Sequence, residues 1–282
     1  MPVYRSARER RAMLAALNAR RFGTEPLLRS ARLPPEVPDT ALGHAAGVPA
    51  VSALRAGLDL HPAVTFLVGE NGSGKSTIVE ALAVAAGLNP EGGGSGMRHA
   101  TAPSHSPLGD QLVLTRGSRR PRTDFFLRAE SVFTLATALD ELAREPMNGD
   151  VLGPYGDVSL HAVSHGESFL AIAHHRFGPE GLYVLDEPES ALSPGNQLAL
   201  LRRIDELIQA DSQFVIATHS PLLVAYPNAR ILLCDDRGLH EIAYDEVPSV
   251  VTMRRFLDGP ATAVAEALAG EAGTARDDDE AG

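Results

Sequence analysis

The chain has 282 residues, of which 44% are hydrophobic, and a formal net charge of −11. This length allows one large α/β domain with a full core, and the net charge argues against a uniformly basic nucleic-acid-binding surface. The sequence contains no run of about 18 apolar residues and no charged-then-apolar leader, so we expect neither membrane insertion nor secretion. The single cysteine, Cys234, cannot form an internal disulfide, which fits a cytoplasmic location.

The first 47 residues are predicted to form a basic arm followed by a proline-rich connection. The middle of the arm, residues 6–21, has a helical pattern. Its eight arginines are Arg5, Arg8, Arg10, Arg11, Arg20, Arg21, Arg29 and Arg32. A solvated helix that balances an acidic body is the favoured interpretation, and an arm that tracks nucleic-acid phosphates is the alternative. Residues 33–50, which contain four prolines, are predicted to be an extended connection.

The stretch 69–77 fits the pattern G-x-x-x-x-G-K-[ST] of a phosphate-binding loop. The apolar run 64–68 before it suits a buried strand, and residues 78–86 suit a helix that ends at Gly87. The glycines of the loop let successive backbone N–H groups turn toward phosphate oxygens. Lys75 is predicted to reach the β- and γ-phosphates of ATP, and the Ser76 hydroxyl to hold Mg²⁺. The nucleotide-binding residues expected here are Gly69, Asn71, Gly72, Ser73, Gly74, Lys75, Ser76 and Thr77.

Lysine usage supports this interpretation of the loop. Of the 25 lysines and arginines, 24 are arginine, and the only lysine is Lys75. A compact ammonium group fits between phosphate oxygens, and a planar guanidinium does not replace it well. The only lysine of the chain therefore lies where binding of a phosphate favours a lysine over an arginine.

The middle of the chain is predicted to hold two strands and a helix. Residues 111–115 and 124–127 have strand patterns, and the basic turn 116–122 joins them. A helix follows from about residue 131, with four core residues at spacings of three and four. These core residues are Val132, Leu135, Leu139 and Leu142.

A second polar helix start lies at Ser164, followed by Gly166 and Glu167. A serine hydroxyl and free backbone N–H groups at such a position can bind an anion, although a simple capping serine gives the same pattern. The context comes from the next apolar strand, 182–185, which ends in Asp186 and Glu187. Beside a phosphate loop, this pair is expected to be a Mg²⁺-associated aspartate followed by a general base.

The last third of the chain continues the alternation of helices and strands. Ser193 is predicted to cap a helix that begins at Pro194 and ends at Gln209. Its core residues are predicted to be Leu198, Leu201, Ile204 and Ile208. The strand 214–218 delivers His219 to the edge where parallel sheets bind ligands, so His219 is predicted to sense the γ-phosphate. Residues 231–234 and 239–243 suit a hairpin, and the alanine-rich, acidic segment 259–282 suits a mobile tail.

Taken in order, the phosphate loop and residues 164–167, 185–188 and 218–221 make residues 48–257 resemble the ATP-binding cassette superfamily of P-loop ATPases. The chain looks most like small stand-alone ATPases labelled AAA-type, related to the SMC and recombination-repair branch. The resemblance implies an α/β fold over residues 48–258, with a mainly parallel core sheet, flanking helices and an antiparallel β portion. It implies ATP and Mg²⁺ as ligands, Asp186 on the metal, Glu187 as the base and His219 as the switch residue. It also implies a head-to-tail homodimer in which Ser164 and Gly166 face the partner's nucleotide and residues 190–193 couple the two sites.

The chain departs from the superfamily pattern in three ways. The signature carries His165 and Glu167 in place of the usual residues, and no glutamine stands plainly where the superfamily has its Mg²⁺-contacting glutamine. Glu130 is the replacement candidate, and Gln111 is the reserve. Only 88 residues, 76–163, separate the phosphate loop from Ser164, so the long coiled coil of SMC proteins is absent.

Three functions fit these residues. The favoured one is an ATPase whose two protomers close over two ATP molecules and drive a partner or nucleic-acid transaction. The second is the nucleotide-binding subunit of a membrane transporter, which the altered signature and the lack of an aromatic residue between Phe22 and Phe66 to stack adenine disfavour. The third is an ATP-gated binding module with little turnover, which Glu187 and His219 disfavour.

Overall fold

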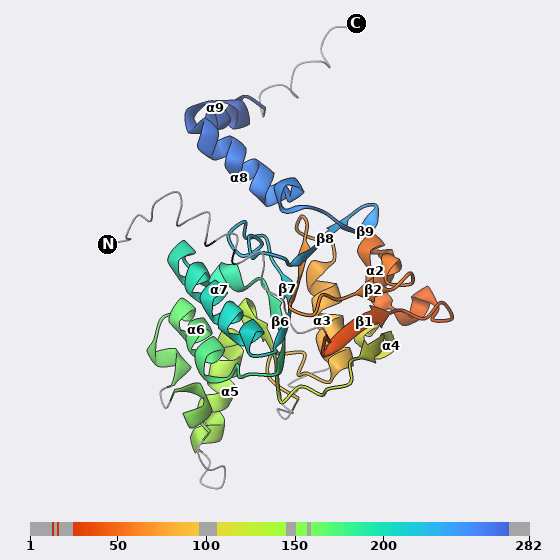
Figure 1. Cartoon of the computed structure of the whole chain (residues 1–282), viewed down its shortest axis with the longest axis vertical. Coiled ribbons are helices and arrows are strands. Elements are labelled where there is room, and N and C mark those ends of the chain that lie inside the picture. Colours follow the sequence, from red (N-terminus) through yellow and green to blue (C-terminus); the bar gives the residue numbers. More distant parts are fainter. Residues whose placement is uncertain are drawn as a thin grey trace, which may run out of the picture.

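A computed structural model describes residues 25–95, 106–144, 151–156 and 159–270, together with the isolated positions Met13 and Ala16. Its centre is a six-stranded sheet in the order β5-β6-β7-β3-β8-β9, which is parallel except for β9 (Figure 1). The strands are β3 (Val64–Val68), β5 (Thr123–Arg128), β6 (Gly181–Asp186), β7 (Gln213–Ala217), β8 (Arg230–Asp235) and β9 (Gly238–Glu241). The predicted fold class, with its mainly parallel sheet and antiparallel portion, is confirmed.

A second, antiparallel sheet has the order β2-β1-β4, with β1 at Leu28–Arg32, β2 at Leu58–Asp59 and β4 at Val113–Arg116. The two strands predicted on either side of the turn 116–122 therefore belong to different sheets. The side-chain amide of Gln213 joins the sheets, because it accepts from Leu28 N and donates to Leu28 O, both at 2.8 Å. Leu28 and Ala31 are fully buried, so the folded domain starts before residue 48, earlier than predicted.

Helices cover both faces of the central sheet. The main helices are α2 (Pro49–Ala53), α3 (Lys75–Ala86), α4 (Leu108–Gln111), α5 (Val132–Arg144), α6 (His165–His175), α7 (Pro194–Gln209), α8 (Pro248–Asp258) and α9 (Pro260–Gly270). Short 3₁₀ helices lie between them at η1 (Asp39–Ala41), η2 (Gly43–Gly47), η3 (Ala129–Ser131), η4 (Gly153–Tyr155), η5 (Leu160–Ala162), η6 (Pro188–Ala191) and η7 (Tyr244–Glu246). Successive residues of a strand point to opposite faces, and this alternation divides the core in two.

The two halves of the core follow from the buried strands. Tyr183 and Leu185 of β6 pack in the cluster that contains residues of α5, α6 and α7. Leu182 and Val184 of the same strand pack in the cluster that contains residues of α3 and the small sheet. All six residues of β6 are buried, as expected for a parallel strand covered on both faces.

Several local predictions are corrected by this arrangement. Residues 33–50 are not extended, because η1, η2 and the start of α2 lie there. On α7, Leu198 is 53% exposed, and Leu200 instead points into the core. The segment from residue 259 is not a tail throughout, because residues 260–270 form α9. The acidic run 277–280 and the six arginines before residue 25 lie outside the described residues.

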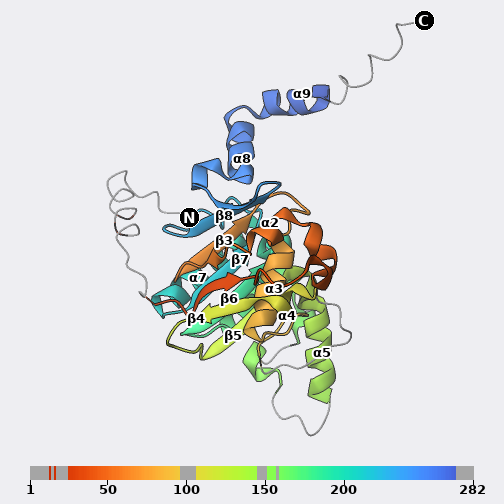
Figure 2. The same ribbon diagram turned by 90° about the vertical axis from the view of Figure 1, so that its right-hand side faces the viewer.

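Helices α8 and α9 extend away from the body of the domain at the side of the β8–β9 hairpin (Figures 1 and 2). Arg255 of α8 and Glu266 of α9 form an ion pair between them. In the described part of the chain, no helix combines the length and the apolar character needed to cross a bilayer.

Candidate nucleotide-binding and hydrolysis site

The phosphate loop joins β3 to α3, and its glycines are required by the backbone. Gly69 has φ +145°, and a Cβ there would lie 2.3 Å from the carbonyl oxygen of Cys234. Gly74, the N-cap of α3, has φ +97°, and a Cβ there would lie 2.4 Å from Val48 Cγ1. Gly72 has φ +80° but open space around it. All three positions use the left-handed region that favours glycine, and two of them also lack room for a side chain.

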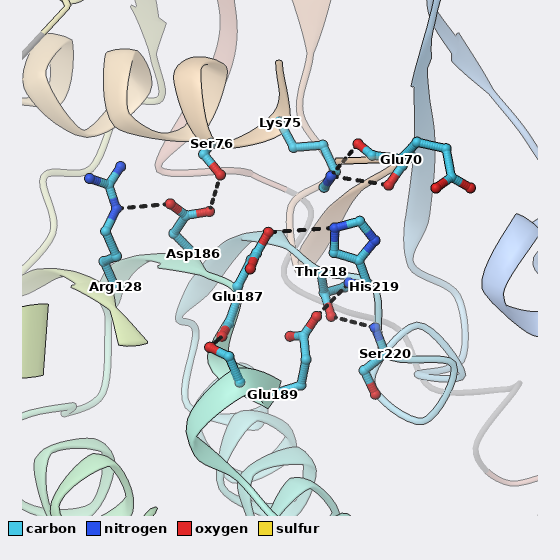
Figure 3. A network of polar contacts seen from close by, with 12 residues as sticks. Glu70, Lys75, Ser76, Arg128, Asp186, Glu187, Glu189, Thr218, His219 and Ser220 are labelled. Carbon is cyan, nitrogen blue, oxygen red and sulfur yellow. Dashed lines mark hydrogen bonds and ion pairs between the residues drawn. The ribbon is translucent and has the colours of Figure 1, made fainter. Parts of the chain in front are cut away.

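Lys75 is the first residue of α3 and is only 3% exposed. Its Nζ donates to the carbonyl oxygens of Gly69 at 3.0 Å and Glu70 at 2.9 Å (Figure 3). Burial lowers the pKa of Lys75, while nearby carboxylates, Glu187 foremost, act to raise it. Two neutral carbonyl oxygens thus hold the ammonium group over the loop. The oxygens of an anionic phosphate are stronger hydrogen-bond acceptors and can take their place.

Asp186, at the end of β6, accepts two hydrogen bonds. The Ser76 hydroxyl donates to Oδ1 and Arg128 Nε donates to Oδ2, both at 2.9 Å. The Asp186 side chain is 4% exposed, and this burial raises its pKa, opposed mainly by the charge of Arg128. The sequence predicted that Ser76 and Asp186 both associate with Mg²⁺, and the structure places these two side chains in contact. The sequence did not predict Arg128, which the pairing of β5 with β6 sets opposite Asp186.

Glu187 and His219 meet at the ends of β6 and β7. Glu187 has φ +47°, an uncommon value for a residue with a side chain, and its N–H donates to Ala217 O at 2.9 Å. Its carboxylate Oε1 lies 3.5 Å from His219 Nε2, and both side chains are about one third exposed. A residue that the sequence did not predict supports the pair: the buried Glu189 carboxylate accepts from the His219 backbone N–H. Burial raises the pKa of Glu189.

The converging groups leave polar atoms ready for an anion. In the described part of the chain, the buried side-chain atoms without a hydrogen-bond partner are Ser73 Oγ, His219 Nε2 and Glu189 Oε2 at this site, together with Arg176 Nε and Arg230 Nε. Buried polar atoms are almost always satisfied, so exceptions at one site indicate a missing ligand. Ser73 Oγ and His219 Nε2 can donate, so together with Lys75 and the backbone of the phosphate loop they fit the phosphates of a nucleotide, whereas Glu189 Oε2 does not.

Comparisons with known proteins agree with this geometry. A family described as "AAA domain, putative AbiEii toxin, Type IV TA system" matches residues 139–225, and one described as "AAA domain" matches residues 55–117. A relative from Haemophilus influenzae, named an uncharacterized ABC transporter ATP-binding protein, is 26% identical over 189 residues, which cover 62% of this chain and 70% of the relative. The resemblance to AAA-type and ATP-binding cassette ATPases is confirmed.

Two solved structures illustrate the range of similar chains. The protein cbiO1 from Clostridium perfringens, described as part of the ABC transporter complex cbiONQ, is 15% identical, with a TM-score of 0.40 over 74% of this chain and 90% of that one. An SMC head domain from Thermotoga maritima is 17% identical, with a TM-score of 0.36 over 66% of this chain and 92% of that one.

The residues predicted to form the signature, Ser164 and Gly166, lie at the start of α6. Ser164 caps this helix, and its N–H and hydroxyl donate to Glu167 Oε2 at 2.9 Å and 2.7 Å. These hydrogen bonds lower the pKa of Glu167. Gly166 is required for packing, since a Cβ there would lie 2.7 Å from Ala191 O of η6. The exposed Ser164 hydroxyl already donates to the Glu167 carboxylate within the capping box. An anion would have to displace Glu167 to accept from this hydroxyl.

The structure distinguishes Glu130 from Gln111 as the candidate for the missing glutamine. Glu130, on η3, lines a cleft of about 250 Å³ with Ser76, Arg128, Asp186, Glu187 and Ser190. Gln111 ends α4, which packs against α3, and does not line this cleft. In the described part of the chain, no three His, Cys, Asp or Glu side chains form a ready metal cage. Mg²⁺ typically binds one or two protein ligands together with nucleotide phosphates and waters, so Ser76 and Asp186 fit it.

Two larger cavities flank the phosphate loop. One of about 420 Å³ lies between residues 70–73 of the loop, Pro49 and the β8–β9 turn. The other, of about 580 Å³ and more apolar, lies between Gly69, His219 and α8. Both have the size of small-molecule sites, so a nucleotide base has room on either side of the loop without an upstream aromatic residue.

Proposed function

We propose that the chain binds Mg²⁺ and ATP and hydrolyses the bond to the γ-phosphate. The observation that carries this proposal is the convergence of Lys75, Asp186, Glu187 and His219 at the ends of β3, β6 and β7 (Figure 3). Ligands bind outside the carboxyl ends of parallel strands, and here that edge holds a cation, two carboxylates and an imidazole. The H. influenzae relative's name, which includes ATP binding, supports the nucleotide.

The residues have separate roles in this scheme. Lys75 would exchange its two carbonyl acceptors for phosphate oxygens, and Ser73 Oγ would gain the partner it lacks. Ser76 and Asp186 would hold Mg²⁺, which neutralises developing charge on the phosphates. Glu187 would orient a water molecule and accept its proton as the water oxygen attacks the γ-phosphorus and the bond to ADP breaks. His219 Nε2, which faces Glu187 in the absence of nucleotide, would turn its single N–H to donate to the γ-phosphate.

We also propose that two chains complete each site. The Ser164 start of α6 belongs to the same chain but is not among the residues that line the cleft at Asp186 and Glu187. A two-fold pair would set this helix start against the partner's nucleotide and create two composite sites. Breaking the Ser164–Glu167 contact would release a hydroxyl and N–H groups for the γ-phosphate.

The test of the proposed activity uses the purified full chain with ATP and Mg²⁺. Binding of a fluorescent ATP analogue and release of phosphate are expected for wild type. In Lys75→Ala both are expected to fall, because the ammonium contact to the phosphates is lost. Arg230→Ala, which removes a cation at the start of β8, is the control and should change neither. Wild-type protein that binds no nucleotide would contradict the proposal.

A second candidate function, the nucleotide-binding subunit of a transporter, is favoured by the name of the H. influenzae relative. The two functions share the site and differ in the partner. A transporter subunit is expected to copurify with a membrane-embedded protein, and its hydrolysis should depend on that protein. An ATPase that is fully active alone would favour the first function.

A further inference from the structure

Arg128 holds a position that the hydrolysis scheme does not explain. It ends β5, and its guanidinium group bridges two carboxylates, donating from Nε to Asp186 Oδ2 at 2.9 Å and from an Nη to Glu80 Oε2 at 2.8 Å. Its side chain is 22% exposed, and those of Glu80 and Asp186 are 15% and 4% exposed. A half-buried ion pair of this kind is little screened by salt.

Arg128 links Asp186, the predicted metal ligand at the end of β6, to Glu80 on α3. Glu80 lies one turn after Ser76 on α3, so both side chains lie on the same face of that helix. Asp186 is already occupied on both oxygens, by Ser76 on Oδ1 and by Arg128 on Oδ2. Each oxygen keeps a second lone pair, so a metal ion can still bind Asp186, but it must approach the fixed positive charge of Arg128.

We infer that Arg128 is a resident cation that competes with Mg²⁺ for Asp186, and that Glu80 receives its guanidinium group when the metal binds. The inference rests on the proposed function, because it concerns the metal that accompanies ATP. Without nucleotide, Arg128 compensates a carboxylate whose burial would otherwise be costly. With nucleotide and Mg²⁺, the divalent ion takes over that compensation, and Arg128 keeps only its contact with Glu80. Arg128 is thus a positioning residue that sets how strongly Mg²⁺ strengthens nucleotide binding.

The experiment measures the magnesium enhancement, defined as the dissociation constant of a fluorescent, non-hydrolysable ATP analogue in EDTA divided by its value in saturating Mg²⁺. Arg128→Gln removes the competitor, so the enhancement is expected to rise about tenfold, the equivalent of one charge-assisted hydrogen bond. Affinity in EDTA is expected to be unchanged or lower, because Arg128→Gln leaves Asp186 without its counter-charge, so the rise in enhancement must appear as a smaller dissociation constant in Mg²⁺. Arg122→Gln is the matched control: it makes the same change in charge just before the other end of β5.

Glu80→Gln is the opposing variant, and it also guards against misfolding of Arg128→Gln. A glutamine at position 80 is neutral and binds the Arg128 guanidinium group less strongly than Glu80 does, so Arg128 stays paired with Asp186. The magnesium enhancement is therefore expected to fall by about threefold to tenfold. Glutamine can still accept the Ser106 N–H that Glu80 Oε1 accepts at 3.0 Å, so the local fold is preserved. The two variants should therefore move the enhancement in opposite directions.

Each outcome decides the matter. An unchanged or lower enhancement in Arg128→Gln, or an unchanged or higher one in Glu80→Gln, would overturn the inference. If Arg128→Gln weakens binding in EDTA as much as in Mg²⁺, Arg128 contacts phosphate instead, and the inference is also wrong. If Arg128→Gln fails to fold, Glu80→Gln alone decides. Wild-type protein that binds no analogue at all would contradict the proposed function, which separates that failure from this one.

Discussion

The Glu187 carboxylate lies 3.5 Å from the His219 imidazole, measured between Oε1 and Nε2. The pairing of β6 with β7 sets Asp186 opposite Ala217, so Glu187, one residue after Asp186, and His219, two residues after Ala217, follow the ends of neighbouring strands. Both remain about one third exposed, which leaves room for a water molecule to reach the carboxylate. In the proposed function, Glu187 is the base and His219 is the neighbouring group that contacts the γ-phosphate.

Glu187→Gln is expected to keep ATP binding and to lose hydrolysis by a factor of about 10²–10⁴, since the amide cannot accept the proton of the attacking water. Phosphate release and equilibrium binding of ATP check the two parts, and ATP-dependent dimers should accumulate in sedimentation. Glu189→Gln is the control, because its amide oxygen can still accept the His219 N–H and a smaller loss of rate is expected. Wild-type turnover by Glu187→Gln would remove the residue from its assigned role.

Gly72→Ala and Gly74→Ala should differ in stability although both glycines have positive φ. At Gly72 the new Cβ meets open space, and only the backbone conformation costs about 1–2 kcal/mol. At Gly74 it would also collide with Val48 Cγ1, which adds about 1–3 kcal/mol. Thermal unfolding without nucleotide measures both. Equal melting temperatures for the two variants would contradict the close approach of the loop to Val48.

Cys234 provides a prediction about pH. Burial raises the pKa of its thiol from an ordinary value of 9.0 to about 12. The folded chain therefore keeps this proton while the unfolded chain loses it, and the free energy of unfolding falls as the pH rises from about 9 to about 12. Within that pH range, the free energy of unfolding of Cys234→Ala should fall less steeply than that of wild type, by about 1.4 kcal/mol per pH unit. Denaturant unfolding at pH 8 to 10.5 checks this, and identical pH slopes for the two proteins would contradict it.

The same burial predicts slow chemistry at the thiol. Because Cys234 is the only cysteine, reaction with a thiol reagent at pH 8 reports on it alone. The folded protein is expected to react far more slowly than the unfolded chain, since thiolate is the reactive form.

Much of the fold and site was predictable from the sequence because their signals are local. Apolar runs predicted β3, β6 and β7, and the residues just after these strands are the phosphate loop, Glu187 and His219, at one edge of the sheet. Two strands of the small sheet were missed, because β1 lies in an arginine-rich segment and β2 has only two residues. Leu198 was assigned to the core and Leu200 was not, since α7 has leucines on adjacent faces. Arg128 and Glu189 were missed for another reason: their partners are set by strand register and by a 3₁₀ turn, which no local pattern encodes.

Composite sites lead to a prediction about mixtures of inactive chains. Lys75→Ala should fail because it loses a phosphate contact, and Ser164→Arg should fail because a long cation blocks the opposite face of the partner's nucleotide. In a mixed dimer, one site collects both defects and the other has none. With random exchange, half of the dimers are mixed and each has one intact site of two, so mixing should restore up to about a quarter of wild-type activity.

Ser164→Ala separates loss of the helix cap from blocking of the interface. It removes the hydroxyl contacts to Glu167 and costs about 1 kcal/mol of helix stability, but it adds no bulk. It should therefore still bind ATP and still pair with a partner chain. Strict coupling between the sites would suppress recovery in the mixture, so the deciding measurement is activity against protein concentration. If sites are shared, turnover per chain must fall as sedimentation shows dimers giving way to monomers; constant turnover in a purely monomeric sample would rule out the shared site.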